Sequence, residues 1–328
     1  MKAFVLHKYG PPDNLTPADL PIPQPGKDEV LVRVRAASVQ PYDWHFLRGE
    51  PYLARLMPGG PGLRKPSIPI LGADISGTVS ALGPGVTGIT VGDEVFAMPK
   101  QGGFAQYAIV HMNDLAPKPA ALSYEQAAAV PLAACTALLA LRDQGRLEPG
   151  QNVLINGASG GVGTFAVQLA KALGAKVTAV CSTRNVSLVH SLGAAHVIDY
   201  TKTNFTREPT RYDLLVDIAG THRGSAARRV LTRKGTLVIV GGPPGRWFQP
   251  AAHAFATLAT APFASQRVVL ADVIHDPNTA ANLRTLTPYL EDGRITPVVD
   301  RVYPFDEIPA AMTYQEQGHA PGKVVITI

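Results

Sequence analysis

A glycine-rich turn between an apolar strand and an amphipathic helix constrains the fold of this chain more than any other feature. The predicted strand 152–156 leads directly into the turn 157–163, and the predicted helix 164–173 follows, with Gly174 at its end. A second apolar strand opens at Val177. Strand, glycine turn, helix and strand in this order indicate a βαβ unit of a parallel sheet.

The same turn predicts a ligand. A pyrophosphate needs backbone N–H groups directed at it, the positive end of a helix dipole and no side chain that blocks its approach. Glycines spaced three residues apart meet these conditions, so we predict that the turn binds the pyrophosphate of a dinucleotide. The predicted contacts are Gly157, Ala158, Ser159, Gly160, Gly161, Val162 and Gly163.

Further strands alternate with helices along the middle of the chain. The strands are near-continuous apolar runs, which is typical of a parallel sheet covered by helices on both faces. Six such runs predict a complete doubly wound sheet of the Rossmann type. The runs are 153–155, 177–180, 196–198, 214–216, 237–240 and 268–270.

Both ends of the chain differ from this middle part. Residues 1–121 read as short strands between Gly and Pro turns, and residues 275–328 contain one helix and short strands that return to complete the first domain. We therefore predict one domain from 1–121 and 275–328, and a dinucleotide-binding domain from 122–274. The Gly- and Pro-rich segment 48–69 is long for a connection and is a candidate binding loop.

The residues after the second Rossmann strand select the cofactor. A carboxylate at this place accepts hydrogen bonds from a ribose 2′-OH, whereas a cation accommodates a 2′-phosphate. The strand is followed by Ser182, Thr183 and Arg184, with no acid among them. We predict NADPH rather than NADH, bound by these three residues, with Asp199 and Tyr200 beside the adenine.

Composition excludes several other classes of protein. The chain has 328 residues and a formal net charge of +5, and its densest basic stretch, 223–234, reads as one helix and its exit without interleaved aromatic residues, which does not predict a nucleic-acid partner. The two cysteines, Cys135 and Cys181, are too few for a disulfide framework or a four-cysteine zinc site. They fit a reducing compartment.

No segment reads as a membrane span or an export signal. The longest apolar tract, 127–141, contains Pro131 and is shorter than the roughly 20 residues that cross a bilayer. The first eight residues alternate like a strand, and their apolar run is too short for a signal peptide. We expect no membrane partner and a cytoplasmic protein.

Several motifs in a fixed order carry a family resemblance. The chain resembles the medium-chain dehydrogenase/reductase superfamily and, within it, the zinc-free quinone oxidoreductase or ζ-crystallin-like branch. The resemblance implies an α/β fold with a Rossmann domain inserted into a GroES-like β-barrel domain, an active site in the cleft between the two, and a homodimer. The motifs are 36–43 with Arg48-Gly49, 71–77, 91–96, 102–107, the glycine turn and 322–325.

Departures from the wider superfamily narrow the chemistry. Its zinc alcohol dehydrogenases hold the metal with a Cys and a His-Glu pair, whereas this chain has Gln40 near the first position and Ala73-Asp74 at the second. The resemblance therefore implies no zinc. Without a Lewis acid, the hydride acceptor must already be electrophilic, as a quinone or an α,β-unsaturated carbonyl is. Gln40 also stands where Asn is common in the branch.

The resemblance assigns further site residues. It implies hydride transfer from the dihydronicotinamide, with Tyr52 in the position of a cleft-lining tyrosine whose hydroxyl donates to the developing oxyanion. Asp43 and Arg48 are expected to form a structural ion pair. The predicted substrate-binding residues are Gln40, Tyr42, Trp44 and His45, and further predicted cofactor-binding residues are Thr136, Ala219, Gly241 and Lys323.

Two other functions fit the same residues. A zinc-independent, NAD(P)-dependent alcohol or aldehyde oxidoreductase would reduce a carbonyl rather than a C=C bond. A non-catalytic NADPH-binding protein would bind the cofactor without turnover, because a fold does not by itself fix a function. The sequence does not name the physiological acceptor.

Overall fold

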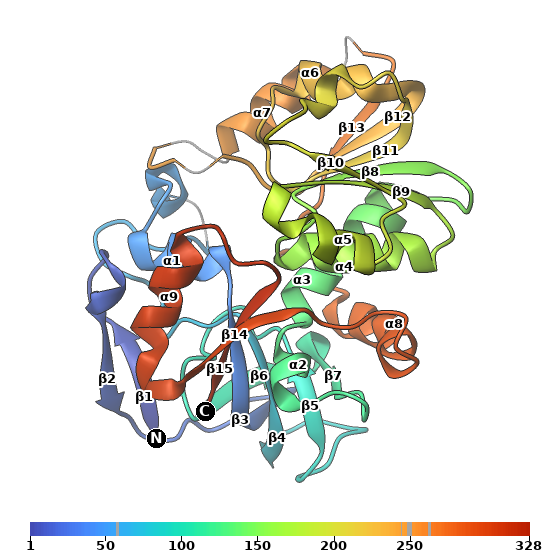
Figure 1. Ribbon diagram of the computed structural model, residues 1–328. Coiled ribbons are helices and arrows are strands. Elements are labelled where there is room, and N and C mark those ends of the chain that lie inside the picture. Colours follow the sequence, from blue (N-terminus) through green and yellow to red (C-terminus); the bar gives the residue numbers. More distant parts are fainter. Residues whose placement is uncertain (57–58, 244, 248–250, 262–263) are drawn as a thin grey trace. The chain divides into compact units, whose positions relative to one another are not determined.

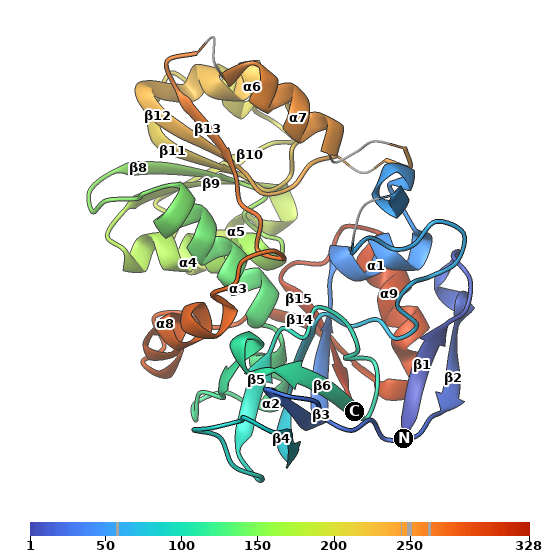
Figure 2. The same ribbon diagram turned by 180° about the vertical axis from the view of Figure 1, so that it is seen from behind.

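The computed structural model describes residues 1–56, 59–243, 245–247, 251–261 and 264–328 (Figures 1 and 2). The chain forms two compact units. Unit 1 consists of Met1–Cys135, Ile274–Gly293 and Pro297–Ile328, and unit 2 of Thr136–Val273 and Arg294–Thr296. Unit 2 is thus inserted into the sequence of unit 1.

Unit 1 extends past the predicted boundary at residue 121. The short helix α2 (Tyr124–Ala128) belongs to it, because Ala128 and Ala129 pack with Ala36 of the sheet and the carbonyl of Tyr124 accepts a hydrogen bond from the Ser76 hydroxyl at 2.6 Å. Small apolar side chains at the end of α2 allow this close approach to the sheet. The helix-rich sequence after residue 121 therefore begins within unit 1.

A seven-stranded sheet forms the centre of unit 1. Its order is β14-β15-β3-β4-β5-β7, with β6 also paired to β3, and β1 and β2 form a separate antiparallel pair. The C-terminal strand β15 pairs antiparallel with β3, so the segments of unit 1 that precede and follow unit 2 in the sequence share one sheet. The strands are β1 (Lys2–Leu6), β2 (Leu15–Asp19), β3 (Glu29–Val39), β4 (Asp74–Leu82), β5 (Glu94–Ala97), β6 (Tyr107–His111), β7 (Leu115–Pro117), β14 (Val299–Pro304) and β15 (Lys323–Thr327).

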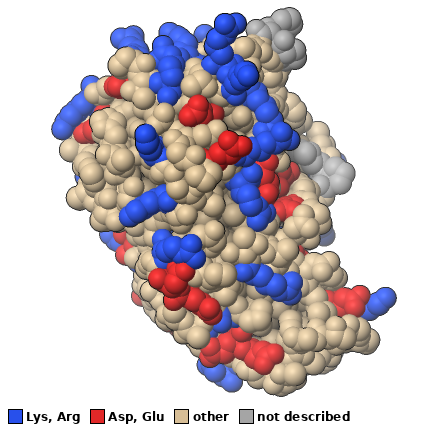
Figure 3. All heavy atoms as spheres, turned by 90° about the vertical axis from the view of Figure 1, so that its right-hand side faces the viewer, with Lys and Arg blue, Asp and Glu red and all other residues tan. Residues whose placement is uncertain are grey.

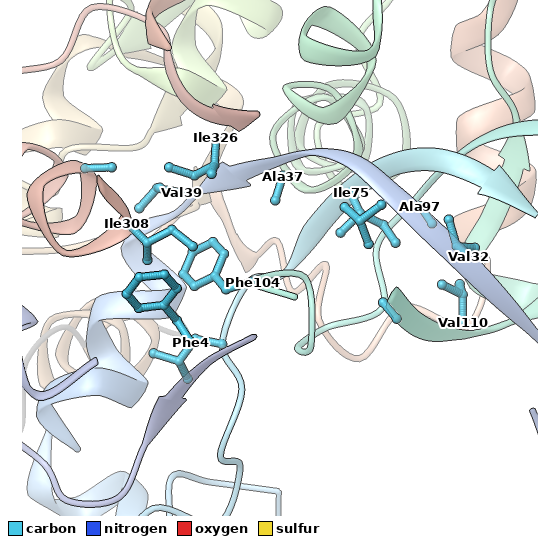
Figure 4. Packing of buried hydrophobic residues seen from close by; sticks show 14 of the residues in the cluster. Phe4, Val32, Ala37, Val39, Ile75, Ala97, Phe104, Val110, Ile308 and Ile326 are labelled. Carbon is cyan, nitrogen blue, oxygen red and sulfur yellow. The ribbon is translucent and has the colours of Figure 1, made fainter. Parts of the chain in front are cut away.

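Alternation of apolar and polar residues builds the core of unit 1. Val30, Val32 and Val34 of β3 are buried on one face, as their spacing of two predicts. Figure 4 shows Phe4, Phe104 and Ile308 at one end of this core. The helices of unit 1 are α1 (Pro41–Arg48), α2, the first part of α3 (Pro131–Leu138), α8 (Thr279–Glu291) and α9 (Ile308–Glu316).

Unit 2 is a doubly wound sheet. All six strands are parallel in the order β10-β9-β8-β11-β12-β13, which confirms the six predicted strands in the described part of the chain. Figures 1 and 2 show α4 and α5 on one face of the sheet and α6 and α7 on the other. The elements are β8 (Asn152–Asn156), α4 (Gly161–Ala172), β9 (Lys176–Cys181), α5 (Val186–Ser191), β10 (His196–Asp199), β11 (Tyr212–Asp217), α6 (Gly224–Ala227), β12 (Leu231–Ile239), α7 (Ala251–Ala259) and β13 (Arg267–Leu270).

The helix predicted in the basic stretch 223–234 is short, and its exit is a 3-10 turn and a strand. Helix α6 covers only Gly224–Ala227, a 3-10 turn follows, and Arg233 lies on β12. Val230 and Leu231 explain the change, because both are buried in the apolar cluster under the sheet, where a continued helix with a charged face would not fit. The prediction of one helix and its exit thus holds, with the helix ending before these two apolar residues.

Charge is distributed unevenly between the units. Unit 2 has 16 Lys and Arg against 7 Asp and Glu, a formal net charge of +9, whereas unit 1 has 14 against 18, which gives −4. On the face drawn in Figure 3, Lys and Arg side chains gather over unit 2. Such a surplus attracts anionic ligands over a distance.

In the ranges described above, no helix combines the length and apolarity that crossing a membrane requires.

Candidate functional site

Backbone contacts leave no room for a side chain at one position of the glycine turn of unit 2 and leave open space at another. Gly157 has a φ of +87°, in the left-handed region that favours glycine. A Cβ on Gly163 would lie 2.1 Å from the carbonyl oxygen of Gly157, so only glycine fits there. A Cβ on Gly160 would meet nothing closer than 3.6 Å. The turn is therefore packed against its own backbone at Gly163 and has free space beside Gly160.

Helix α4 begins directly at this turn. Gly160 is its N-cap residue and Gly161 its first residue, so the first N–H groups of the helix point out of the turn, where the helix dipole is positive. An open cradle of glycine backbone at a helix N-terminus fits a pyrophosphate. The structure thus brings the predicted residues 157–163 into one site.

Two further residues that were predicted to bind the cofactor, Ala219 and Gly241, lie at the edge of the sheet where its strands end. Ala219 follows β11, and its backbone nitrogen lies 3.3 Å from the point where a Cβ on Gly157 would be. Gly241 follows β12, and a Cβ there would lie 2.4 Å from the carbonyl oxygen of Ile218. The carboxyl ends of the strands are where open α/β sheets bind ligands.

Asp217, which the sequence did not single out, organises this edge. Its buried carboxylate accepts hydrogen bonds from Asn156 Nδ2 at 2.8 Å and from the backbone N–H of Gly220 at 3.0 Å. Burial raises the pKa of the Asp217 carboxyl. By joining the ends of β8 and β11, Asp217 fixes the loop that carries Ala219.

The residues predicted to select the cofactor lie after β9, and the neighbouring Asn185 links them to the glycine turn. Asn185, which sequence reasoning passed over, donates from Nδ2 to Ser159 Oγ at 2.9 Å and to Ser182 Oγ at 3.4 Å. Arg184 and Tyr200 are exposed. The Thr183 hydroxyl, predicted as a phosphate ligand, donates to Asp199 Oδ2 at 2.6 Å.

Unit 1 contains a second polar group of residues, entirely buried. We define the carboxylate cluster as Ser38, Gln40, Asp43, Asp74 and Lys323, none of which is more than 2% exposed. Asp74 lies at its centre. Its Oδ2 accepts from Ser38 Oγ at 3.1 Å and from Gln40 Nε2, and its Oδ1 accepts from the backbone N–H of Leu132 at 3.0 Å.

The carboxylate cluster contains its own cation, the ammonium of Lys323, beside its two acids. The ammonium of Lys323 lies 3.9 Å from Asp74 Oδ2. Burial raises the pKa of Asp43 to about 7 and that of Asp74 to about 6, and it lowers the pKa of Lys323 to about 8. Lys323, predicted to contact the cofactor, thus faces a carboxylate of its own unit.

The expected ion pair of Asp43 with Arg48 is not formed, and this prediction was wrong. Asp43 instead turns back over the start of α1, where it accepts from the N–H of Gln40 at 2.8 Å and that of Gly72 at 3.1 Å. Arg48, at the other end of α1, makes a bidentate pair with Glu316 of α9 at 2.6 and 2.7 Å. An acid in the first helical turn satisfies free N–H groups, so Asp43 caps the helix.

The hydrogen bond of His45 determines which of its two ring nitrogens carries the proton. Its Nδ1 lies 2.8 Å from the carbonyl oxygen of Glu50, and its ring stacks on Trp44 with centroids 3.9 Å apart. A carbonyl oxygen only accepts, so Nδ1 carries the proton and Nε2 of the neutral ring is an acceptor. Burial lowers the pKa of His45, which favours the neutral ring. Tyr42 packs on Phe46 at 4.8 Å.

Tyr52 begins a 3-10 turn (Tyr52–Leu56) in the candidate binding loop. The Arg55 guanidinium lies 4.7 Å from the centre of the Tyr52 ring and 4.2 Å from that of Tyr9, and its Nε donates to the carbonyl of Gly49 at 2.7 Å. Arg55, which the sequence did not single out, therefore fixes the loop to the end of α1. Residues 57–58 of the loop lie outside the described residues.

Thr136 is buried in α3, next to Cys135. Asp74 ties the first turn of this helix, at Leu132, to the carboxylate cluster. Among the residues that the structure describes, no group of three or more His, Cys, Asp and Glu side chains is arranged to hold a metal ion.

Comparisons with known proteins agree with this architecture. Residues 26–120 match the family model of the alcohol dehydrogenase GroES-like domain, and residues 192–326 match the model described as zinc-binding dehydrogenase. The 2-methylene-furan-3-one reductase of Solanum lycopersicum is 35% identical over 99% of this chain and 79% of its own length. The chloroplastic NADPH-dependent alkenal/one oxidoreductase of Arabidopsis thaliana is 34% identical with the same coverage.

A solved structure extends the likeness to the whole fold. The quinone oxidoreductase of Coxiella burnetii superposes with a TM-score of 0.86 over 100% of this chain and 99% of that one, at 29% identity. These are enzymes of the medium-chain dehydrogenase/reductase superfamily. The chain belongs to the quinone oxidoreductase branch of that superfamily, as its motifs predicted.

Proposed function

We propose that the protein is an NADPH-dependent reductase that transfers a hydride to a quinone or to the β-carbon of an α,β-unsaturated carbonyl without zinc. One observation carries the proposal. Gln40 and Asp74 stand where zinc dehydrogenases of the superfamily hold their metal. Here the Gln40 amide donates to the Asp74 carboxylate, and that carboxylate also faces the ammonium of Lys323 in a buried cluster. The ammonium takes the place of an external cation beside the carboxylate.

The printed activities of the relatives support the acceptor class. One is named for the reduction of 2-methylene-furan-3-one, and another for alkenals and alkenones. Both acceptors carry a C=C bond conjugated to a carbonyl. Such a β-carbon is electrophilic without a Lewis acid, in agreement with the donor set of the carboxylate cluster.

The chain's own residues would bind and orient the cofactor. Backbone N–H groups of the glycine turn would hold the pyrophosphate, and Ser182 and Arg184 the adenosine end with its 2′-phosphate. When bound, the dihydronicotinamide supplies a hydride from its C4. Orientation of two reactants in one site accounts for much of the rate enhancement of such a reaction.

Tyr52 is the proposed proton donor on the substrate oxygen. Hydride addition to an enone places negative charge on that oxygen, and a phenolic O–H can donate to it. Arg55 lies over the Tyr52 ring and keeps it in place. Gln40, Tyr42, Trp44 and His45 are proposed to contact the substrate, with His45 Nε2 available as an acceptor.

Three further features remain predictions. We expect the protein to act on a small molecule, to form a homodimer and to work in the cytoplasm. Dimer formation is tested by sedimentation of the purified protein. Localisation is tested by fractionation of the cells that express it, since the two relatives named above differ in whether their names give a compartment.

The cofactor part of the proposal is tested at Arg184. Arg184→Ala removes a cation that would contact the 2′-phosphate and nothing that NADH needs. We expect KM for NADPH to rise about tenfold and KM for NADH to stay within twofold. The matched control is Arg233→Ala, an exposed arginine on β12 of the same unit. Equal weakening for both cofactors would contradict the assignment of Arg184.

The reaction is tested by following NADPH oxidation with a panel of quinones, enones and aldehydes, together with the zinc content of the same protein. We expect turnover with quinones or enones at less than about 0.1 zinc per chain. Turnover with aldehydes alone would establish the alcohol or aldehyde oxidoreductase instead. Tight NADPH binding without any turnover would establish a binding protein.

A further inference from the structure

We propose that Asp199 is a specificity-determining residue of the cofactor subsite, whose carboxylate limits the preference for a 2′-phosphorylated cofactor and allows NADH to bind. This inference rests on the proposed function, because it concerns the same dinucleotide site. It differs from the sequence-based prediction, in which Ser182, Thr183 and Arg184 together formed a phosphate subsite without an acid.

The topology of the sheet brings the acid to this place. Strands β9 and β10 are parallel neighbours, and Asp199 at the end of β10 is the register partner of Cys181 at the end of β9. The segment that follows Cys181 therefore passes beside Asp199. In ordinary Rossmann sites the acid that reads the 2′-position ends the second strand. Here the second strand has none, and the third strand supplies one.

The Asp199 carboxylate is surrounded by donors. Thr183 Oγ1 donates to Oδ2 at 2.6 Å, while the N–H and the hydroxyl of Thr201 donate to Oδ1 at 3.0 and 2.8 Å. The ammonium of Lys202 lies 3.5 Å from Oδ2. These contacts hold the side chain of Asp199 at 13% exposure, whereas that of Lys202 is 70% exposed.

The hydrogen bond of Thr183 determines what this residue can recognise. A hydroxyl has one proton, and the shortest contact of Thr183 Oγ1 directs that proton at Asp199. Thr183 Oγ1 also lies 2.9 Å from Thr201 Oγ1, whose own proton goes to Asp199 Oδ1. Phosphate oxygens of a dianion only accept, so Thr183 has no proton to offer them in this arrangement. A ribose 2′-OH is itself a donor, and both Thr183 Oγ1 and Asp199 can accept from it. Two groups of the subsite thus fit the hydroxyl and not the phosphate.

Charge acts in the same direction. The hydrogen bond from Thr183, followed by those from Thr201, lowers the pKa of Asp199 to about 2, so the carboxylate is ionised at any physiological pH. Its negative charge opposes a 2′-phosphate and also attracts Lys202, which would otherwise be available to that phosphate. Arg184 has the opposite effect, because its guanidinium would attract the 2′-phosphate. The balance between one guanidinium and one carboxylate sets the ratio of the two cofactor affinities.

Replacement of Asp199 by Asn tests both effects together. An Asn amide group can donate to Thr183 Oγ1, which frees the Thr183 proton for a phosphate oxygen, and the loss of charge frees Lys202. We expect Asp199→Asn to raise the ratio of Kd for NAD⁺ to Kd for NADP⁺ about three- to tenfold, mainly by tighter NADP⁺ binding, a range typical of one partly exposed charge. The matched control is Asp143→Asn, an acid of the same unit that precedes β8 and pairs with Arg142.

The measurement is calorimetric binding of NADP⁺ and of NAD⁺ to the wild type and the two variants, so it does not depend on turnover. A ratio that is unchanged or lower in Asp199→Asn would overturn the inference while NADP⁺ binding by the wild type still supports the proposed function. A wild type that binds neither dinucleotide would overturn both.

Thr183→Val provides a second test if Asp199→Asn folds poorly. It removes the hydroxyl and leaves the carboxylate, and valine matches threonine in shape. Because the Thr183 proton is held by Asp199, we expect Kd for NADP⁺ to stay within about twofold. A tenfold weaker binding of NADP⁺ alone would show that Thr183 donates to the phosphate and would overturn the inference.

Discussion

The glycine turn of unit 2 and the carboxylate cluster of unit 1 achieve rigidity in opposite ways. The turn is one continuous segment, and its shape follows from backbone contacts such as that of Gly163 with Gly157. The cluster joins side chains from β3, β4 and β15 to the first turn of α3, and its residues lie up to 285 positions apart in the sequence. The first can be read from neighbouring residues, and the second requires the completed fold.

The two regions also differ in how they fail. A contact between backbone atoms is disturbed by adding volume, whereas a buried network is disturbed by removing one of its partners. Substitutions that add a methyl group should therefore affect the turn, and substitutions that delete a carboxylate should affect the cluster. The predictions below test this difference, from the largest expected effect to the smallest.

Asp74→Ala should have the largest effect on stability. It leaves the Lys323 ammonium and the Leu132 N–H buried without the partner that Asp74 provides. Breaking a buried pair from one side destabilises by about 3 to 5 kcal/mol. Chemical denaturation measures the loss. Lys323→Met together with Asp74→Ala should recover part of it, and a double variant less stable than Asp74→Ala alone would contradict the pairing.

The pH dependence of stability should reveal the buried Asp43. Burial raises its pKa from 3.8 to about 7, so the folded protein holds a proton there that the unfolded chain releases. Its contribution to stability is therefore present at low pH and is lost as the pH rises from about 4 to about 7. At about 1.36 kcal/mol per pKa unit, the stability of the wild type relative to Asp43→Asn should fall by about 3 kcal/mol across this range.

Asp19→Asn, an exposed acid on β2, is the control for this titration. Its stability relative to the wild type should change much less between pH 4 and 7. A difference between wild type and Asp43→Asn that stays constant, or that grows with pH, would mean that Asp43 is ionised in the folded protein. The capping contacts would then have outweighed the burial of the charge.

Gly163→Ala tests the turn. Its new Cβ would collide with the carbonyl of Gly157, so we expect a loss of about 1 to 3 kcal/mol and weaker NADPH binding. Gly160→Ala is a matched control in the same turn, because its Cβ has room and its φ of −79° suits alanine. We expect Gly160→Ala to change stability by less than about 0.5 kcal/mol. Equal losses in both variants would show that the turn is not packed against its own backbone at Gly163.

Tyr52→Phe tests whether unit 1 contributes chemistry as well as structure. If the hydroxyl donates to the substrate oxygen, kcat for an enone should fall roughly tenfold, and kcat for a quinone less, because a quinone spreads the charge through its ring. The contact of Arg55 with the ring of residue 52 is kept in Tyr52→Phe. An unchanged enone kcat would remove Tyr52 from the mechanism.

The sequence predicted those parts of the fold that local patterns determine. The six strands of unit 2, the glycine turn and α4 each follow from residues within one segment, and all are present. In the stretch 223–234 the sequence predicted a helix and its exit but not where the helix ends, because the burial of Val230 is a property of the finished sheet. Asp43 and Arg48 were paired on their closeness in sequence, although Arg48 binds Glu316, 268 positions away.

Only part of the candidate site in unit 2 could be predicted from the sequence. The shape of the glycine turn was predictable from the sequence because backbone shape is encoded locally, and its binding of a pyrophosphate stays a prediction. Asn185 could have been noticed in the sequence as an amide next to a predicted phosphate subsite. Its partner Ser159 follows a different strand, so their contact is not visible in the sequence. Asp199 was visible as the end of a strand, and only the pairing of β9 with β10 shows that it meets Thr183.

The position to which the hydride goes tests the proposed activity most directly. With NADPH deuterated at the transferred position of C4, an enone as acceptor and a chelator present, deuterium should appear on the β-carbon of a saturated ketone, at the rate seen without chelator. Product analysis by NMR locates the label. Deuterium on the carbonyl carbon, or activity that the chelator abolishes, would contradict a zinc-independent reduction of the conjugated double bond.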